Sequence, residues 1–156
     1  MILTLTNVAK SLASYLKPFF PGTTFAEGPI QQGYTEPYMF LQSRGADIKP
    51  MTGRMFLWTI RLDLTYLLDL NQPEMQKKYE ASAQLMDILL DTFPYTDGNA
   101  TREVRAFNRS WDISIDELHY RFELRAIVSM EELAELMQTL ELNIELKEAL
   151  ARMLEP

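Results

Sequence analysis

Two long segments of the chain alternate apolar and polar residues with a period of two. In Met55–Leu67, apolar side chains occupy every second position, and polar ones such as Arg61 and Asp63 fall between them. Residues 118–128 repeat the pattern, with polar residues such as Arg121 between apolar ones. Because successive side chains of a strand point to opposite faces, this pattern predicts two strands, each buried on one face.

Weaker patterns predict shorter extended segments at 23–26, 38–43 and 103–115, the last one broken near Asn108. Asp116-Glu117 is the predicted hairpin turn into the second alternating strand. Neither residue readily takes a positive φ, so a turn longer than two residues is expected.

Gly and Pro residues mark three further irregular stretches. A turn-rich stretch is predicted at 27–37, a long loop at 44–53 and a turn at 95–100. These stretches separate the predicted strands and helices.

Apolar residues at helical spacing predict two helices before residue 95. The first follows a cap at Thr6 or Asn7 and is ended by Pro18. The second follows a cap at Asn71, and its apolar stripe extends as far as Phe93.

The C-terminal part has two interpretations. Ser129 and Glu132 form a capping-box pattern that opens a helix. Apolar residues then alternate over 140–146, which favours a short helix, a strand near 140–146 and a helical tail. One long helix over 130–154 is the alternative.

The order of helix, strands, helix, hairpin and tail does not alternate as in doubly wound folds. It predicts an α+β fold with a largely antiparallel or mixed sheet and helices packed on one face. The length of 156 residues fits one domain, residues 1–156, with a core of about 1–147 and a tail of 148–156.

Composition excludes several kinds of chemistry. The chain has no Cys and one His, so it lacks a thiolate zinc site and a Cys nucleophile. Its formal net charge of −7 argues against broad binding to nucleic-acid phosphates. No apolar run is long enough to span a membrane, and the start lacks the basic leader of a signal peptide. These features favour a soluble protein of a reducing compartment.

One local cluster could support catalysis: Asp112, Asp116, Glu117 and His119. Carboxylates near a His can bind a metal or transfer protons. A polar turn beside a solvated strand face explains the same residues, because turns favour Asp for backbone reasons, and this is the preferred interpretation. No catalytic, cofactor-binding or metal-binding residue is predicted.

A second polar group forms only if the two alternating strands share a sheet. Arg61 and Asp63 would then face His119, Arg121 and other charged residues of the second strand. Such a charge ladder could line a subunit contact, but a solvated sheet face with weak cross-strand pairs is the preferred interpretation.

The order of several short motifs resembles the tail terminator family of long-tailed bacteriophages, in particular its members from phages and prophages of Gram-positive bacteria. The motifs are Gln32-Gly33, Pro37-Tyr38-Met39-Phe40-Leu41, Gly53-Arg54, Asp63-Leu64-Thr65-Tyr66, Asp116-Glu117-Leu118-His119-Tyr120 and the segment 136–143. The likeness spans roughly residues 1–147. The chain departs from the family in a shorter hairpin without Gly, in Leu64 for Ile, and in extra residues past Lys147.

The resemblance implies a structural role in virion assembly, without a cofactor. Such proteins form a ring, usually of six subunits, that caps the head-proximal end of the tail tube and joins the head connector. Their partners are further copies of the chain, the tail tube protein and a head–tail connector protein. DNA passes through the lumen without specific binding, and no membrane is involved. The protein is then expected in the virion tail, and in the host cytoplasm during assembly.

The loop 44–53 and the turn 94–102 are the expected contact surfaces. Two other functions compete with the terminator role. One is another phage neck component, such as a head-completion or connector protein. The other is a small metal-dependent hydrolase that uses Asp112, Asp116 and His119.

Overall fold

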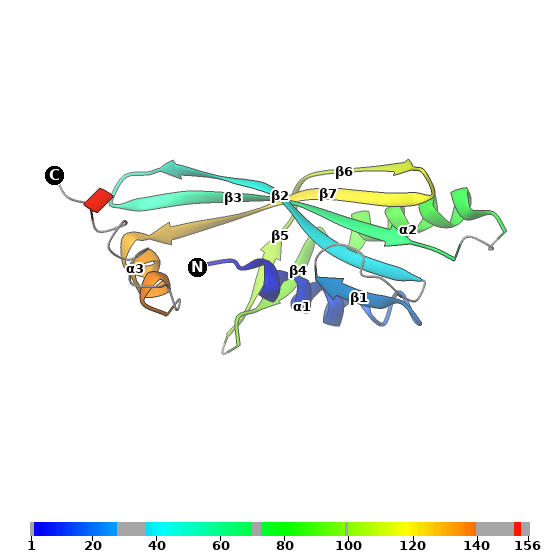
Figure 1. Cartoon of the computed structure of the whole chain (residues 1–156), viewed down its shortest axis with the longest axis horizontal. Coiled ribbons are helices and arrows are strands. Elements are labelled where there is room, and N and C mark those ends of the chain that lie inside the picture. Colours follow the sequence, from blue (N-terminus) through cyan, green and yellow to red (C-terminus); the bar gives the residue numbers. More distant parts are fainter. Residues whose placement is uncertain (1, 28–36, 70–72, 99, 140–151, 154–156) are drawn as a thin grey trace.

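The computed structural model describes residues 2–27, 37–69, 73–98, 100–139 and 152–153. Its elements form a sheet with helices on one side (Figure 1). In chain order they are α1 (Leu5–Leu16), β1 (Thr24–Glu27), β2 (Tyr38–Pro50), β3 (Met55–Leu67), α2 (Met75–Leu89), β4 (Thr92–Thr96), β5 (Thr101–Arg105), β6 (Phe107–Ser114), β7 (Glu117–Ser129) and α3 (Met130–Thr139).

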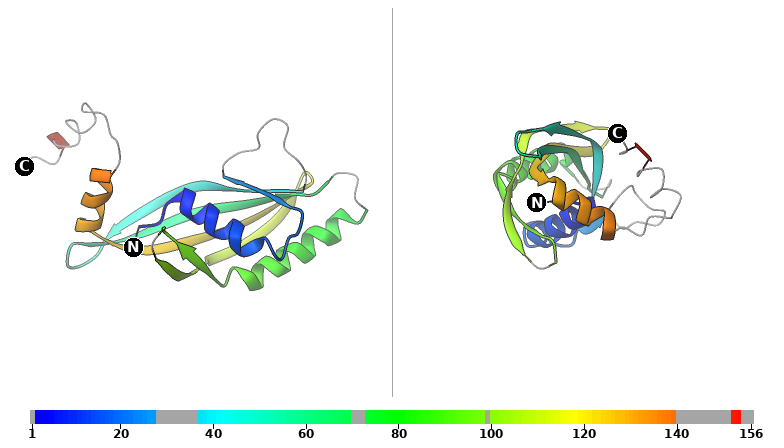
Figure 2. Two further views of the ribbon diagram at one scale, coloured as in Figure 1. Left: turned by 90° about the horizontal axis from the view of Figure 1, so that it is seen from below. Right: turned by 90° about the vertical axis from the view of Figure 1, so that its left-hand side faces the viewer.

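The main sheet has the strand order β1-β2-β3-β7-β6, and only the β1–β2 pair is parallel. The two alternating segments, β3 and β7, pair along nearly their whole length, from Met55 opposite Ser129 to Tyr66 opposite Leu118. β4 and β5 form a separate hairpin. Figure 2 shows α1 and α2 on the same side of the curved sheet. The predicted α+β fold is therefore confirmed.

The core lies between the helices and the inner face of the sheet. Alternate residues of β3 and β7 point into it, and the buried faces of α1 and α2 cover them. Tyr120 of β7 donates a hydrogen bond to Asp87 of α2, with an oxygen–oxygen distance of 2.6 Å. Burial raises the pKa of the Tyr120 hydroxyl. Among the described helices, none is long and apolar enough to cross a bilayer.

The predicted loop at 44–53 is wrong. β2 continues to Pro50 and pairs with β3 as far as Phe56, so that only a tight turn around Gly53 is irregular. A bulge between Ser43 and Ala46 lets the strand pass Gly45, whose φ of 112° suits glycine. These residues looked like a loop because both faces of this part of the strand are exposed, so no polar–apolar alternation marks them.

Both predicted helix caps differ from the structure. Thr4 caps α1, because its hydroxyl accepts a hydrogen bond from the Asn7 backbone N–H. α2 begins only at Met75, so Asn71, which lies outside the described residues, is not its cap. Phe93 was assigned to the helical stripe, but it is buried in β4 after α2 has ended.

The predicted break near Asn108 is confirmed, since β5 and β6 lie in different sheets and Asn108 has a φ of 50° in a bulge. The predicted turn at Asp116-Glu117 lies one residue too late, and the expectation that it is longer than two residues is wrong. Ser114 pairs with Glu117, so Ile115 and Asp116 alone form the turn, with φ of 47° and 58°. Positive φ at both central residues is the type I′ pattern that fits the twist of a hairpin.

This turn has an unfavourable sequence, which leads to a first prediction. Ile115 is β-branched, and its backbone has the left-handed conformation, which lowers stability by about 1–2 kcal/mol. Ile115 is also 92% exposed. The double variant Ile115→Asn, Asp116→Gly is expected to raise the free energy of unfolding by about 1 kcal/mol in urea titrations. Ile127→Asn, at an exposed position in an extended strand, is the control and should bring no gain. A lower urea midpoint for the turn variant would contradict this prediction.

The capping box at the start of the C-terminal helix is confirmed in part. The Ser129 hydroxyl accepts a hydrogen bond from the Glu132 backbone N–H, and α3 follows directly. The choice between a strand near 140–146 and one long helix falls on residues outside those described. The division into a core of 1–147 and a tail of 148–156 stays a prediction.

Candidate functional site

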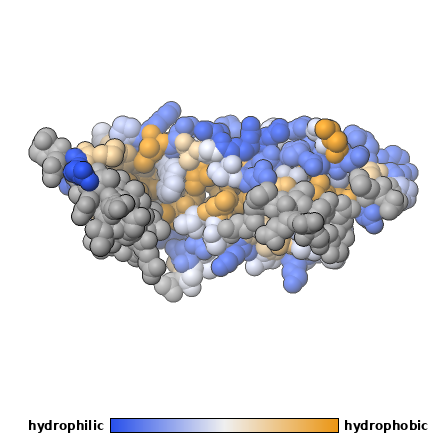
Figure 3. Space-filling view, in the orientation of Figure 1, coloured by the Kyte–Doolittle hydropathy of each residue, from blue (hydrophilic) through white to orange (hydrophobic). Residues whose placement is uncertain are grey.

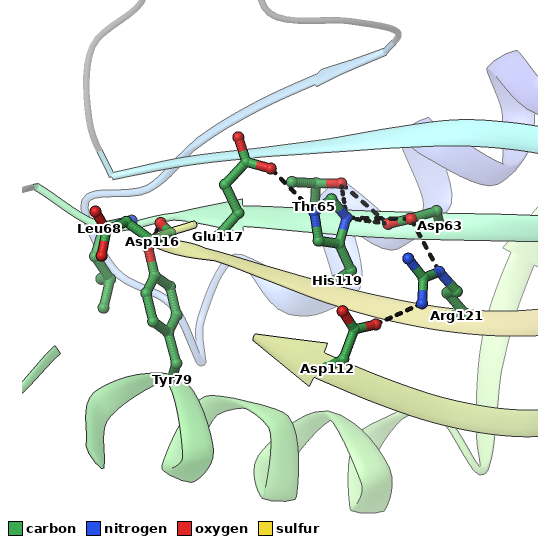
Figure 4. Close-up of polar contacts among 9 residues, drawn as sticks. All are labelled: Asp63, Thr65, Leu68, Tyr79, Asp112, Asp116, Glu117, His119 and Arg121. Carbon is green, nitrogen blue, oxygen red and sulfur yellow. Dashed lines mark hydrogen bonds and ion pairs between the residues drawn. The ribbon is translucent and has the colours of Figure 1, made fainter. Parts of the chain in front are cut away.

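Polar side chains gather on the outer face of the sheet, at the end of β3 farthest from the β2–β3 turn (Figure 4). The sheet register places Asp63 opposite Arg121 and Thr65 opposite His119. The period-two pattern directs all four side chains away from the core, as the sequence predicted for strands that share a sheet.

Asp63 is the centre of this polar cluster. Its carboxylate accepts a hydrogen bond from the Thr65 hydroxyl at 3.0 Å and lies 3.2 Å from His119 Nδ1. The Arg121 Nε lies 3.5 Å from it as an ion-pair partner. Asp63 is only 6% exposed and Thr65 only 1%. The interpretation of this face as simply solvated is therefore wrong for these two residues.

The remaining groups of the polar cluster also have partners. His119 Nε2 lies 3.0 Å from a carboxylate oxygen of Glu117. The Arg121 Nη1 donates to Asp112 at 2.5 Å. Arg121 thus lies between the carboxylates of Asp63 and Asp112, and His119 lies between those of Asp63 and Glu117. Such mutual pairing offsets the cost of burying Asp63.

The four residues considered for catalysis, Asp112, Asp116, Glu117 and His119, are brought together only in part. Glu117 and His119 are in contact, but the Asp112 carboxylate faces Arg121 (Figure 4). Asp116 takes part through its backbone carbonyl, which accepts a hydrogen bond from the Tyr79 hydroxyl. Within the described residues, no group of three or more acidic or His side chains is placed to hold a metal. The convergence that a metal-dependent hydrolase requires of its ligands is not seen there.

Farther along the same outer face, two ion pairs continue the predicted charge ladder. Arg61 pairs with Asp47 of β2 at 2.5 Å, and this hydrogen bond lowers the pKa of the Asp47 carboxyl. Arg125 pairs with Glu123 at 3.6 Å, and its guanidinium lies 4.3 Å from the ring centre of Phe107. These exposed pairs contribute little stability compared with the polar cluster.

A second prediction separates the buried pair from the exposed ones. Arg121→Met leaves the Asp63 carboxylate buried without its cation, and we expect it to cost about 2 kcal/mol of unfolding free energy in urea. Arg125→Met is the control and should cost less than about 1 kcal/mol. Equal losses for the two variants would show that burial of Asp63 does not matter.

The other distinctive feature is the end of the β2–β3 hairpin, residues 43–61, here called the arm. Figure 1 shows it reaching beyond α1 and the β4–β5 hairpin, with α3 beside it. At its tip Ile48 is 53% exposed and Met51 46% exposed. Its inner face carries Phe56, Trp58 and Ile60, which are only half-buried. Figure 3 shows hydrophobic residues at the surface along the middle of the molecule, below a hydrophilic rim.

Sequence reasoning placed contact surfaces at 44–53 and 94–102. The first is the β2 side and turn of the arm, which was predicted as a loop. The second is mostly strand, because β4 and β5 pair as far as Thr96 opposite Thr101. Their roles in contacts remain predictions. The buried state of Asp63 was missed, and the register opposite Arg121 is the feature that could have indicated it.

A polar cluster whose charged groups pair with one another and an exposed, apolar-tipped arm are typical of a protein that works through contacts with other proteins. The family comparison agrees. A family model described as "Phage tail terminator protein" matches residues 7–135, which is 129 of the 156 residues. The chain belongs to this family and is a structural protein of a phage tail, associated with the virion. No curated protein sequence matches the chain.

Proposed function

We propose that this protein forms a closed ring that caps the head-proximal end of the tail tube. The ring stops polymerisation of the tube and offers its other side to the head–tail connector. Six subunits are the expected number. The proposal extends the family membership over residues 7–135, and the protein acts without catalysis.

The observation that carries the proposal is the arm. Its tip exposes Ile48 and Met51 to solvent in the isolated subunit, although burial of apolar side chains is favourable. Exposing apolar side chains on an extension is unfavourable in free energy. This exposure is explained if another protein covers the side chains in the assembly. A ring assembled on a tube is such an environment.

Capping follows from how a tube grows. Each ring of a growing tube leaves a face that accepts another identical ring. A protein that matches this face on one side and differs on the other ends the growth. A closed ring needs unlike patches on each subunit, so that every subunit meets its neighbour in the same way.

The charge of the chain suits a ring around DNA. Six subunits would carry a formal charge of 6 × (−7) = −42. Acidic side chains that face the lumen would repel the phosphate backbone and let DNA pass without binding.

The test uses polymerising tail tube protein of the same phage. The protein is added at a small fraction of the tube protein concentration. We expect light scattering to reach a lower plateau, because capped tubes stop growing while they are still short. Bovine serum albumin at the same concentration is the control. Unchanged growth would contradict the proposal, and binding to connector rings instead would favour another neck component.

A further inference from the structure

We infer that the arm of one subunit docks into an apolar groove at the opposite end of a second copy of this chain. The inference rests on the proposed ring and names the two surfaces that would close it. The groove lies between the end of α1 and α2, and it is lined by Phe19, Tyr66, Lys78, Ala81 and Leu85 among others.

The arm supplies the inserting side of this contact. Ile48 and Met51 are both about half exposed, and they lie within a few residues of the β2–β3 turn. No described strand pairs with the outer edge of β2 beyond the β1 contact, which ends at Leu41. Within the described part of the chain, no strand would have to be displaced from this edge when the arm approaches another molecule.

The groove supplies the receiving side. It is an open depression of about 330 Å³, and Phe19 at its rim is 46% exposed. Tyr66 and Leu68 close its floor from the end of β3, while Ala81 and Leu85 form its α2 wall. A depression of this size accepts one or two aliphatic side chains such as those at the arm tip.

The arm cannot reach the groove of its own subunit. The arm tip lies at the Met55 end of β3, whereas the groove lies at the Leu67 end. Twelve residues of extended strand separate them by roughly 40 Å. An apolar tip at one end and an apolar groove at the other produce a head-to-tail contact, which generates rings when the rotation closes.

Charge favours the same pairing. The arm carries four basic residues and one acidic, a net charge of +3; they are Arg44, Lys49, Arg54, Arg61 and Asp47. Around the groove, whose lining includes Lys78, the end of α1, the segment from Leu67 to Glu80 and the β6–β7 turn carry three basic and five acidic residues among those described, a net charge of −2. They are Lys17, Lys77, Lys78, Asp69, Glu74, Glu80, Asp116 and Glu117. Asp112 is left out because Arg121 pairs with it.

The first turn of α3 adds negative charge on one side of the arm. It places Glu131 and Glu132 near Arg54, whose carbonyl accepts a hydrogen bond from the Met130 N–H. The basic character is therefore concentrated on the β2 side, at Arg44 and Lys49. Arm-to-arm pairing would bring these like charges together, whereas arm-to-groove pairing brings opposite charges together.

The absence of Cys from the chain allows a direct test by disulfide cross-linking. Met51→Cys places a thiol at the arm tip, and Ala81→Cys places one in the groove. Under mild oxidation, with and without tail tube protein, the two single variants mixed together should form heterodimers. A chain with both substitutions should form a ladder of covalent oligomers. The matched control is Gln84→Cys, an exposed α2 residue outside the groove lining.

Three results would overturn the inference: disulfide dimers of Met51→Cys alone, equal cross-linking to Gln84→Cys, or no cross-link in either condition. These results are separable from failure of the proposed function. Tubes that stop growing without an arm-to-groove cross-link would leave the capping function intact. Cross-linked rings beside tubes that keep growing would leave the contact intact and remove the capping function.

Discussion

Replacing Ile48 and Met51 together with serine is expected to weaken tube capping by about thirtyfold. Each side chain is roughly half exposed in the subunit, so covering it in an assembly contributes about 1 kcal/mol. Two such losses per contact amount to about 2 kcal/mol, which corresponds to that change in an equilibrium constant. The measurement is the concentration of protein that halves the final length of polymerising tail tubes.

The same variant should fold normally, because neither side chain belongs to the buried core. Its thermal midpoint is the first control. Met153→Ser is the second, since Met153 is 80% exposed but lies outside the segment that matches the family. Full capping activity of the arm variant would show that the tip makes no functional contact. Substitution is preferable to deleting residues 45–52, which would remove the strand that pairs with the first half of β3.

Tyr79→Phe is expected to lower the free energy of unfolding by about 3 kcal/mol. The Tyr79 hydroxyl is buried and bridges three segments of the chain. It accepts a hydrogen bond from the Leu68 N–H at 2.9 Å and donates one to the Asp116 carbonyl at 2.6 Å. Removing it leaves a buried N–H without this partner and releases the β6–β7 turn from α2, and each loss costs about 1–3 kcal/mol.

Urea unfolding at pH 7 measures this effect. The matched control is Tyr15→Phe, which removes one hydrogen bond, from the Tyr15 hydroxyl to the Leu89 carbonyl at 2.9 Å. It should cost about 1 kcal/mol. If Tyr79→Phe is no more destabilising than the control, the bridge from Tyr79 of α2 to Leu68 and to the β6–β7 turn does not stabilise the fold as argued.

The sequence best predicts strands that have one polar, solvent-facing side and one apolar, buried side. β7 meets this condition along its length, whereas β3 alternates apolar and polar residues but is half-buried or buried on both faces. Both were placed within one residue of their observed bounds. The end of β2 does not meet it. Residues 43–50 are exposed on both faces, and only pairing with β3 keeps them extended. Sequence periodicity cannot report a strand that is held by its neighbour alone.

Local turn chemistry also had limits. Ile115-Asp116 forms a two-residue turn against the preferences of both residues, because the long β6–β7 pairing on either side dictates it. Phe93 was misassigned for a related reason. Its spacing continues the α2 stripe, yet the chain leaves the helix after Leu89 and buries Phe93 from β4 instead.

In the candidate site too, the local sequence pattern predicted which residues share a face but not which of them are buried. The sequence placed Asp63 and His119 on one polar face, and the register confirms this. It did not predict that Asp63 would be buried, because burial depends on side chains from several strands around it. The arm tip and the groove lie at opposite ends of the molecule, so their complementarity appears only once the fold is known.

The most direct test of the central claim is negative-stain microscopy of tail tubes grown with this protein. The account predicts a ring at one end of each tube, absent from the other end, on tubes that no longer elongate when fresh tube protein is added. A mass near 6 × 18.1 = 108.6 kDa for rings released from such tubes would support six subunits. Tubes with two bare ends that resume growth would contradict the account.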